Sequence, residues 1–385
     1  MRGIALIVRA GAVVCASAFL FSLLVHGPTK PAVASNEAVQ ASAGATAKAA
    51  AEKRAAQKAA KKPAATKVPP GVVAVVATGD IVMGSTPNLP PDGGRSFFSD
   101  VQTDLAGDVV VGNLEGTLST GGSSKCGAAS TSCFAFHTPP SYARWLARAG
   151  FTVMNLANNH AYDFGAEGLT QTIDALDKVG LLHTGRPNQI TVQKVGRIRV
   201  ATVGFAPYPW AASLTDIAAA KKLVRAADRV SDVVVVTMHA GAEGRDRQHV
   251  HRGTERFLGE NRGDPIRFAH AVVDAGADLV VGSGPHVLRG MEWYKDRLIA
   301  YSLGNFAGYD VFSLGGPLST SAILRVTLDG VGRFESGQLV PTHMVGAGLP
   351  ALDESEAAHG IVRSLSREDF GARGVKVSRE GVLSR

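Results

Sequence analysis

The sequence predicts an α/β domain in which two packed β-sheets carry helices on their outer faces. Short β-branched runs alternate with helical patterns along most of the chain, which is typical of buried strands joined by helices. Residues 321–344 instead alternate apolar and polar side chains, as antiparallel strands with one buried face do. The two patterns together indicate an α-β-β-α sandwich. The chain of 385 residues, 45% of them hydrophobic, is long enough to bury one large core.

Strands are expected at seven places: Val72–Thr78, Asp108–Gly112, Phe151–Asn155, Arg197–Phe205, Asp232–His239, Ala277–Gly282 and Arg297–Ser302. Helices are expected at four places: Pro139–Gly150, Ala166–Val179, Leu214–Ala227 and Pro265–Ala275. The first helix opens on proline and closes on glycine, the usual punctuation of a helix. Beyond Glu354 the chain becomes polar, so residues 351–385 are predicted to form a peripheral C-terminal segment.

An N-terminal tail precedes this domain, which is expected over residues 71–350. Residues 1–34 contain an apolar run from Ile4 to Val25 with Arg2 and Arg9 at its start. This pattern predicts a signal peptide cleaved near Ala34, or an uncleaved membrane anchor. Residues 35–70 are rich in Ala and Lys and cannot bury a core, so they are predicted to form a linker. The domain is therefore expected outside the cytoplasm, held at the cell membrane or secreted.

The net charge of +7 resides in this tail. Residues 1–70 contain ten Lys and Arg but only two Asp and Glu, whereas the remaining residues contain thirty and thirty-one. Binding to nucleic acid requires a basic surface on the folded part, so the sequence predicts no nucleic-acid partner. The basic tail is suited to anionic lipid or an anionic wall polymer, or is a solvated linker.

Two cysteines, Cys126 and Cys133, lie close together in a loop rich in Gly, Ser and Ala. In an exported domain such a pair is expected to form a disulfide. The alternative is two unpaired thiols in a cytosolic protein.

Polar side chains stand where five of the expected strands end. They are Asp80, Asn113 with Glu115, Asn159 with His160, His239 and His286. The ends of several strands meet at one edge of a sheet, where α/β proteins keep their chemistry. Carboxylate oxygens and imidazole nitrogens are ligands for a divalent metal ion that serves phosphate or ester chemistry. The sequence therefore predicts a metal centre at this edge.

Each of these residues also has a structural interpretation when it is taken alone. Asp80 taken alone is better suited to capping a turn, and Glu115 could equally be a surface turn residue. For His239 and His286 a satisfied structural position is the less favoured interpretation. The segment from Asn158 to Asp163 favours function more clearly, because it packs four polar side chains into one loop after a buried strand.

In this order the residues resemble the CapA family of bacterial capsule-synthesis proteins, also called the PgsA type of poly-γ-glutamate synthesis. The resemblance extends over residues 72–342. It rests on Gly79-Asp80, Asn113-Leu-Glu115, Asn158-Asn-His-Ala-Tyr-Asp163, His239 with Glu243, Gly284-Pro-His286 and Tyr301-Ser-Leu-Gly-Asn-Phe306. This family looks like a branch of the calcineurin-like metallophosphoesterases, so the resemblance implies their two-sheet α-β-β-α sandwich.

The resemblance also implies roles for individual residues. The implied metal ligands are Asp80, Glu115, Asn159, His239 and His286. His160 would protonate the leaving group and Asp163 would orient it, while Asn113, Glu243 and Asn305 would contact the substrate. The implied cofactor is one or two divalent ions, Mn²⁺ or Mg²⁺.

Two positions depart from the metallophosphoesterase pattern. Val82 stands where the first motif has a histidine, and Gly284 replaces the first histidine of the last motif. Lost ligands weaken a metal site. The expected function is therefore the handling of an anionic polymer, poly-γ-glutamate or a capsular polysaccharide, by a metal-dependent hydrolase or transferase. The alternatives are an inactive scaffold or polymer-binding subunit of a synthesis or export complex, and an exported phosphodiesterase.

Overall fold

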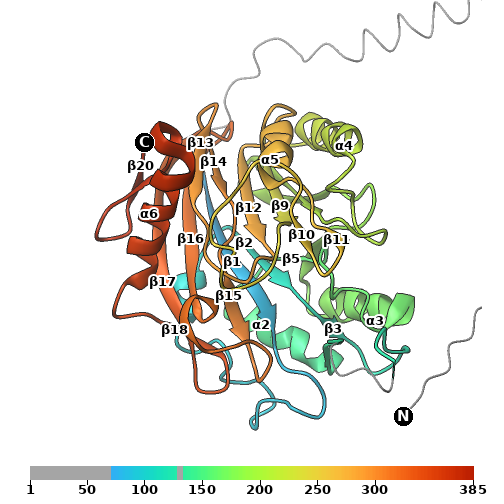
Figure 1. The fold of residues 1–385 in the computed structure, drawn as a ribbon. Helices are drawn as coiled ribbons and strands as arrows, with labels where there is room; N and C mark the ends of the chain where they lie inside the picture. Colours follow the sequence, from blue (N-terminus) through green and yellow to red (C-terminus); the bar gives the residue numbers. More distant parts are fainter. Residues whose placement is uncertain (1–70, 128–132) are drawn as a thin grey trace, which may run out of the picture. The chain divides into compact units, whose positions relative to one another are not determined.

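Two mixed β-sheets lie face to face in the computed structural model, which describes residues 71–127 and 133–385 (Figure 1). The strands of the first sheet are β1 (Val72–Val82), β2 (Val109–Leu114), β5 (Val153–Asn155), β6 (Leu182–Thr184), β15 (Asn305–Gly308), β16 (Thr320–Asp329), β17 (Phe334–Val345) and β18 (Leu349–Leu352). Their order is β18-β17-β16-β1-β2-β5-β6, and β15 also pairs with β1. The half from β1 to β6 is parallel and the half from β16 to β18 is antiparallel.

The second sheet has six strands in the order β13-β14-β12-β9-β8-β7. They are β7 (Thr191–Val195), β8 (Ile198–Phe205), β9 (Val233–His239), β12 (Leu279–Ser283), β13 (Met291–Tyr294) and β14 (Arg297–Ala300). Three short pairs accompany the sheets: β3 (Thr117–Leu118) with β4 (His137–Thr138), β10 (Arg256–Phe257) with β11 (Glu260–Asn261), and β19 (Lys376–Val377) with β20 (Leu383–Ser384). The central strands β8, β9, β12 and β14 are parallel, so they end at one edge.

Helices cover the outer faces of both sheets. They are α2 (Ala143–Ala149), α3 (Gly165–Lys178), α4 (Ile217–Val230) and α5 (Pro265–Val273), with 3-10 turns at Gln102–Leu105, Pro140–Tyr142, Gly316–Leu318 and Gly371–Arg373. In β1, Val75 belongs to the core between the sheets, whereas its neighbour Val76 packs with α2 and α3. In β9, Val235 faces the same inner core and Val236 packs with α4 and α5. This alternation confirms the predicted α-β-β-α sandwich.

The observed bounds differ from the predicted ones where tertiary pairing intervenes. β1 runs to Val82, beyond the predicted end at Thr78, because it changes partner on one edge: Val72–Ala77 pair with β16, and the strand then pairs with β15 from Asp80 onward. The predicted helix 214–227 begins at Ile217 instead, because the Asp216 side chain accepts a hydrogen bond from the backbone N–H of Ala219.

The C-terminal segment, predicted to be peripheral, belongs to the body of the domain. Helix α6 (Ala357–Phe370) buries Ala358 and Val362 in the core between the sheets and contacts both β13 and β17. The Phe370 ring stacks on Tyr301, with ring centroids 5.1 Å apart. The prediction was wrong because it followed the average polarity of the segment, whereas α6 buries Ala358, Val362 and Leu365.

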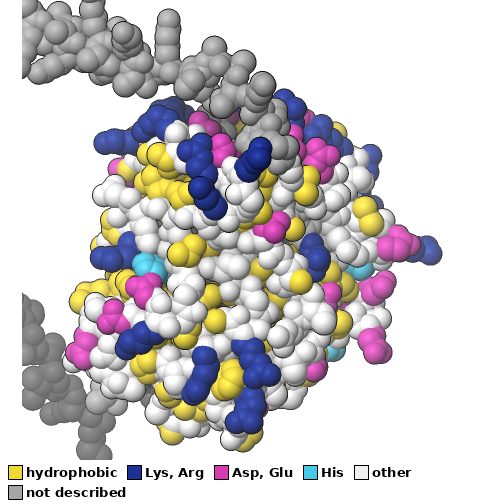
Figure 2. Space-filling model, turned by 180° about the vertical axis from the view of Figure 1, so that it is seen from behind, with side chains coloured by type: hydrophobic (Ala, Val, Ile, Leu, Met, Phe, Trp, Pro, Cys, Tyr) yellow, Lys and Arg dark blue, Asp and Glu magenta, His cyan; other side chains and the backbone are white. Residues whose placement is uncertain are grey.

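The disulfide between Cys126 and Cys133 is present, which confirms the predicted pair. Within residues 71–127 and 133–385 no helix has the length and apolarity that a membrane span requires. The predicted signal peptide or anchor and the linker lie outside the described residues. On the face shown in Figure 2, basic side chains form separate groups among acidic and uncharged ones.

Substituting Gly360 with alanine is expected to stabilise the protein. Gly360 lies inside α6, is exposed, and a Cβ atom there would meet nothing within 4 Å. Alanine costs less backbone entropy than glycine in a helix, so the free energy of unfolding should rise by about 0.5–1 kcal/mol. Thermal denaturation followed by circular dichroism should show a Tm higher by about 1–3 °C. A lower Tm would contradict this prediction.

Candidate metal centre

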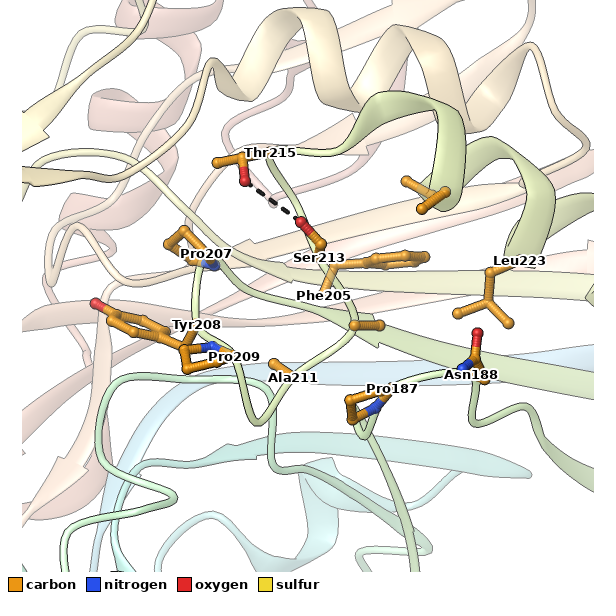
Figure 3. Close-up of a pocket in the computed structure, with 13 residues that line it drawn as sticks. Pro187, Asn188, Phe205, Pro207, Tyr208, Pro209, Ala211, Ser213, Thr215 and Leu223 are labelled. Atoms are coloured by element: carbon orange, nitrogen blue, oxygen red, sulfur yellow. Dashed lines mark hydrogen bonds between the residues drawn. The ribbon is translucent and has the colours of Figure 1, made fainter. Parts of the chain in front are cut away.

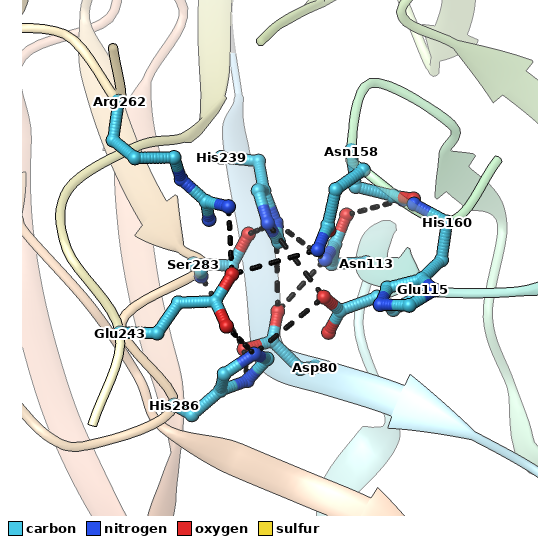
Figure 4. A network of polar contacts seen from close by, with 12 residues as sticks. Asp80, Asn113, Glu115, Asn158, His160, His239, Glu243, Arg262, Ser283 and His286 are labelled. Atoms are coloured by element: carbon cyan, nitrogen blue, oxygen red, sulfur yellow. Dashed lines mark hydrogen bonds and ion pairs between the residues drawn. The ribbon is translucent and has the colours of Figure 1, made fainter. Parts of the chain in front are cut away.

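The structure brings the predicted site residues together where strands of both sheets end (Figure 4). The residues at or inside strand ends are Asp80 in β1, Asn113 in β2, His239 at the end of β9 and Asn305 at the start of β15. The residues in the loops that follow are Glu115 after β2, Asn159, His160 and Asp163 after β5, Glu243 after β9, and His286 after β12. Hydrogen bonds and ion pairs connect most of them into one polar network.

Three residues form the centre of this network: Asp80, Glu115 and His239. Each is 0% exposed, and each offers a ligand atom that lies within 4.8 Å of the other two. Among the described residues, the His239 Nε2 and both carboxylate oxygens of Glu115 are buried without a hydrogen-bond partner. Buried polar atoms without partners are costly, and a divalent cation would satisfy all three at once. Two carboxylates and an imidazole therefore fit the implied metal ion by geometry and by ligand chemistry.

The pKa shifts at this centre also favour a bound cation. Burial raises the pKa of Glu115 well above its usual value, and the nearby charge of Asp80 raises it further. Burial also lowers the pKa of His239 well below its usual value, as does the positive charge of Arg262. A histidine binds a metal ion in its neutral form, which the lowered pKa of His239 favours. The carboxylates of Asp80 and Glu115 repel each other, and a bound cation would offset this repulsion.

Asn113, which the resemblance implied as a substrate contact, lies inside the polar network and contacts the residues of the centre. Its amide Nδ2 donates to Asp80 Oδ1 at 2.7 Å and lies 3.2 Å from His239 Nδ1. Its Oδ1 accepts hydrogen bonds from Asn155 and Asn158. Two donors occupy the amide oxygen, and Nδ2 faces both Asp80 and His239. Asn113 therefore fixes the orientation of Asp80 and His239.

His286 lies against the carboxylates from the opposite sheet. Its Nδ1 is 3.1 Å from Asp80 Oδ2 and 2.9 Å from Asn305 Oδ1. The Asn305 amide donates to the carbonyl of Leu318, which turns its oxygen toward His286, so Nδ1 carries the proton. Nε2 lies 3.7 Å from Glu115 Oε1 and 3.6 Å from Glu243 Oε2. Burial opposes protonation of His286, but the charge of Glu115 and the bond to Asp80 raise its pKa well above the usual value.

Glu243 links the centre to Arg262. Its Oε1 lies 2.6 Å from Arg262 Nη1, and Asn159 Nδ2 approaches the same oxygen at 3.5 Å. Burial raises the pKa of Glu243, but the close contact with His286 and the charges of His286 and Arg262 lower it to about 2. Glu243 is therefore an ionised structural partner of both cations. The Oδ1 of Asn159 is buried without a hydrogen-bond partner among the described residues, so it can serve as a ligand.

His160 and Asp163 form a closely held pair beside the centre. Asp163 Oδ2 lies 2.8 Å from His160 Nδ1 and also accepts the backbone N–H of Phe136. Lys125 lies 2.6 Å from the other oxygen of Asp163. Burial lowers the pKa of His160, opposed by its hydrogen bond to Asp163. Because Nδ1 is held by Asp163, Nε2 is the atom that can exchange a proton with a substrate.

The two departures from the metallophosphoesterase pattern have physical causes in this structure. Val82 is 2% exposed at the end of β1, in the hydrophobic core. Gly284 has φ +106°, and a Cβ atom there would lie 3.0 Å from His239 Cδ2. Its backbone N–H points to Asp80 Oδ2 at 3.3 Å. A histidine at this position would displace His239, so the chain supports Asp80 from the backbone instead.

A largely apolar pocket adjoins the polar network through Tyr208 (Figure 3). It has a volume of about 440 Å³ and is lined by Phe205, Pro207, Tyr208 and Pro209 together with Leu223 of α4. Tyr208 lines this pocket with its ring, while its hydroxyl accepts from Arg262. None of the predicted site residues lines it.

Sequence reasoning missed two residues of the site, Arg262 and Lys125. Arg262 follows β11 in a polar stretch that has no local pattern, and only its pairing with Glu243 reveals its position. Lys125 precedes Cys126, and its place beside the disulfide is the only feature of the sequence that could have identified it as a site residue.

Fold and site together define a class: a two-sheet α/β sandwich that holds a buried carboxylate–imidazole centre at its strand ends. The chain belongs to the family of bacterial capsule synthesis proteins PGA_cap, which matches residues 74–309. It is 30% identical to the PGA biosynthesis protein CapA of Bacillus subtilis over 77% of this chain and 78% of that protein. It is 37% identical to the capsule biosynthesis protein CapA of Bacillus anthracis, over 41% of this chain and 40% of that protein.

Among solved structures, a 5′-nucleotidase precursor from Thermus thermophilus is similar over 77% of this chain and 59% of that chain. The sequences are 15% identical and the TM-score is 0.39. The family membership rests on the sequence relatives alone.

Proposed function

We propose that this chain is a metal-dependent hydrolase or transferase that acts on an anionic capsule-type polymer such as poly-γ-glutamate. The observation that carries the proposal is the buried trio of Asp80, Glu115 and His239, in which Glu115 and His239 hold ligand atoms without hydrogen-bond partners among the described residues. The matched family is named for bacterial capsule synthesis and a relative for PGA biosynthesis, and these names support the proposed substrate class. The disulfide and the predicted export signal support a position outside the cytoplasm, at the membrane or secreted.

A divalent ion held by Asp80, Glu115 and His239 would polarise a carbonyl or phosphoryl oxygen of the substrate. The chain's own residues arrange the rest. Asn113 and the backbone N–H of Gly284 fix the direction of Asp80. Asp163 holds His160 at Nδ1, so that Nε2 can pass a proton to the leaving group.

A second candidate function is a scaffold or polymer-binding subunit of a synthesis or export complex. Val82 and Gly284 favour it, because neither position supplies a ligand and the remaining set is smaller than the metallophosphoesterase pattern that the resemblance implied. The scaffold would bind the polymer without shortening it.

One experiment on the full-length protein distinguishes the hydrolase or transferase from the scaffold. Bound metal is measured by elemental analysis, and poly-γ-glutamate is incubated with the protein and Mn²⁺ or Mg²⁺. The proposal expects bound metal and shortening of the polymer that a chelator abolishes. Normal polymer binding without any shortening would establish the scaffold instead. Cleavage of a phosphodiester but not of the polymer would indicate an exported phosphodiesterase.

A further inference from the structure

Arg262 is held rigidly beside the candidate metal centre. Its side chain is 1% exposed, and its backbone is fixed at both polar atoms. The N–H of Arg262 donates to the carbonyl of Glu255 at 3.0 Å, and its own carbonyl accepts from Gly241 at 2.9 Å. The guanidinium points toward Glu243, with Arg262 and His160 on opposite sides of His239 (Figure 4). This residue is therefore a preorganised buried cation at the edge of the centre.

Only one nitrogen of this guanidinium donates a hydrogen bond to a partner among the described residues. Nη1 lies 2.6 Å from Glu243 Oε1 and donates to the Tyr208 hydroxyl at 2.9 Å. Nε and Nη2 are buried and have no hydrogen-bond partner in the part of the chain that the structure describes. The N–H groups of Nε and Nη2 point the same way along one edge of the guanidinium, and this edge binds a carboxylate with two parallel hydrogen bonds.

A second buried arginine, Arg289, shows which acceptors this protein provides for a guanidinium with a structural role. Arg289 is 0% exposed, and the two oxygens of Glu255 lie 2.9 and 2.8 Å from its Nη1 and Nη2. Its Nε donates to the carbonyl of Arg247 at 2.7 Å. The protein therefore supplies every nitrogen of Arg289 with an acceptor but leaves Nε and Nη2 of Arg262 without one among the described residues. An open edge on a buried cation indicates a ligand, because unmet charged donors are costly to bury.

We propose that the Nε and Nη2 edge of Arg262 binds a carboxylate of a γ-linked glutamyl chain beside the metal centre. This inference rests on the proposed function for the identity of the polymer. A γ-linked chain carries one free α-carboxylate on each residue. The fork formed by the Nε–H and Nη2–H groups of Arg262 can therefore bind the α-carboxylate of one residue. Arg262 then fixes the substrate on one side of His239, while His160 lies on the other.

The test observes the Nε–H group directly by nuclear magnetic resonance. Full-length protein with ¹⁵N-labelled arginine and saturating Mg²⁺ is titrated with tetra-γ-glutamate and, separately, with inorganic phosphate. The Arg262 signal is assigned by its loss in Arg262→Lys. We expect this signal to move in a saturable way with tetra-γ-glutamate. Calorimetry should show an affinity about 10-fold weaker or more in Arg262→Lys, because lysine keeps the charge but not the fork.

The matched control is Arg247→Lys, which changes a half-exposed arginine of the neighbouring loop. It should bind tetra-γ-glutamate as the wild type does, and metal content measured by elemental analysis should be unchanged in both variants. If Arg262→Lys does not fold, Tyr208→Phe assigns the signal instead, since it removes only the hydroxyl on Nη1. The wild-type titration then decides the question alone.

An Arg262 signal that stays still while tetra-γ-glutamate binds would overturn this inference and leave the proposed function intact. A signal that moves with phosphate, with no binding of tetra-γ-glutamate, would overturn both the carboxylate assignment and the proposed polymer. Equal affinity of the wild type and a folded Arg262→Lys for tetra-γ-glutamate would also overturn it, because the fork would then contribute nothing.

Discussion

The His239→Ala variant is expected to lose its bound divalent metal. His239 ends β9 and is fully buried, and its Nε2 faces Glu115 Oε1 at 3.6 Å without a hydrogen-bond partner among the described residues. Alanine would leave two carboxylates with no nitrogen ligand. Loss of a group that only supports a ligand lowers metal affinity by about 10- to 100-fold, so loss of a ligand itself should exceed that. Elemental analysis after dialysis measures the bound metal.

The matched control for this variant is His249→Ala. His249 is a half-exposed histidine that pairs with Asp369 at 2.7 Å and takes no part in the metal centre. Its replacement should leave the metal content at the wild-type level. Asp80→Ala should behave as His239→Ala does, because Asp80 belongs to the same trio. Wild-type metal content in both His239→Ala and Asp80→Ala would eliminate the metal centre as described.

Much of this centre could be predicted because its signals are local in the sequence. A β-branched run followed by a polar residue identifies a strand end, and parallel strands bring their ends together. Asp80 and His239 were located in this way. The loop containing His160 and Asp163 was recognised by its unusual density of polar side chains.

The remaining parts depend on contacts between distant segments, which no local pattern records. Arg262 becomes part of the site only through Glu243 and Tyr208. Asn113 was recognised as a site residue, but its role as a positioning group depends on four partners from other strands and loops. The short strand β15 is defined by its pairing with β1, so its composition alone could not identify it.

Gly284, where the resemblance implied a histidine, also takes a different meaning in three dimensions. From the sequence it is a missing ligand. In the structure the absence of a side chain lets the loop approach His239, and the backbone N–H supports Asp80. Gly284 therefore supports Asp80 from the backbone at the position where the resemblance implied a ligand. This support is compatible with a centre built around one ion held by Asp80, Glu115 and His239.

The Gly79→Ala variant is expected to be strongly destabilised and to lose metal together with its native fold. Gly79 precedes Asp80 inside β1, and a Cβ atom there would overlap the backbone carbonyl of Gly304. That carbonyl accepts the N–H of Asp80 at 3.0 Å, so the two segments cannot separate without losing this bond. The φ angle of Gly79 is not in the left-handed region, so steric overlap alone causes the cost. We expect the free energy of unfolding to fall by about 3 kcal/mol or more.

Gly360→Ala is the control that separates this steric effect from any general effect of replacing glycine with alanine. The two changes add the same methyl group, one against a backbone carbonyl and one into open space. Denaturant unfolding should therefore shift in opposite directions, to a lower midpoint for Gly79→Ala and a higher one for Gly360→Ala. If Gly79→Ala unfolded at the wild-type midpoint with its metal retained, β1 and Gly304 could not approach as closely as described. The position of Asp80 in the centre would then lose its structural basis.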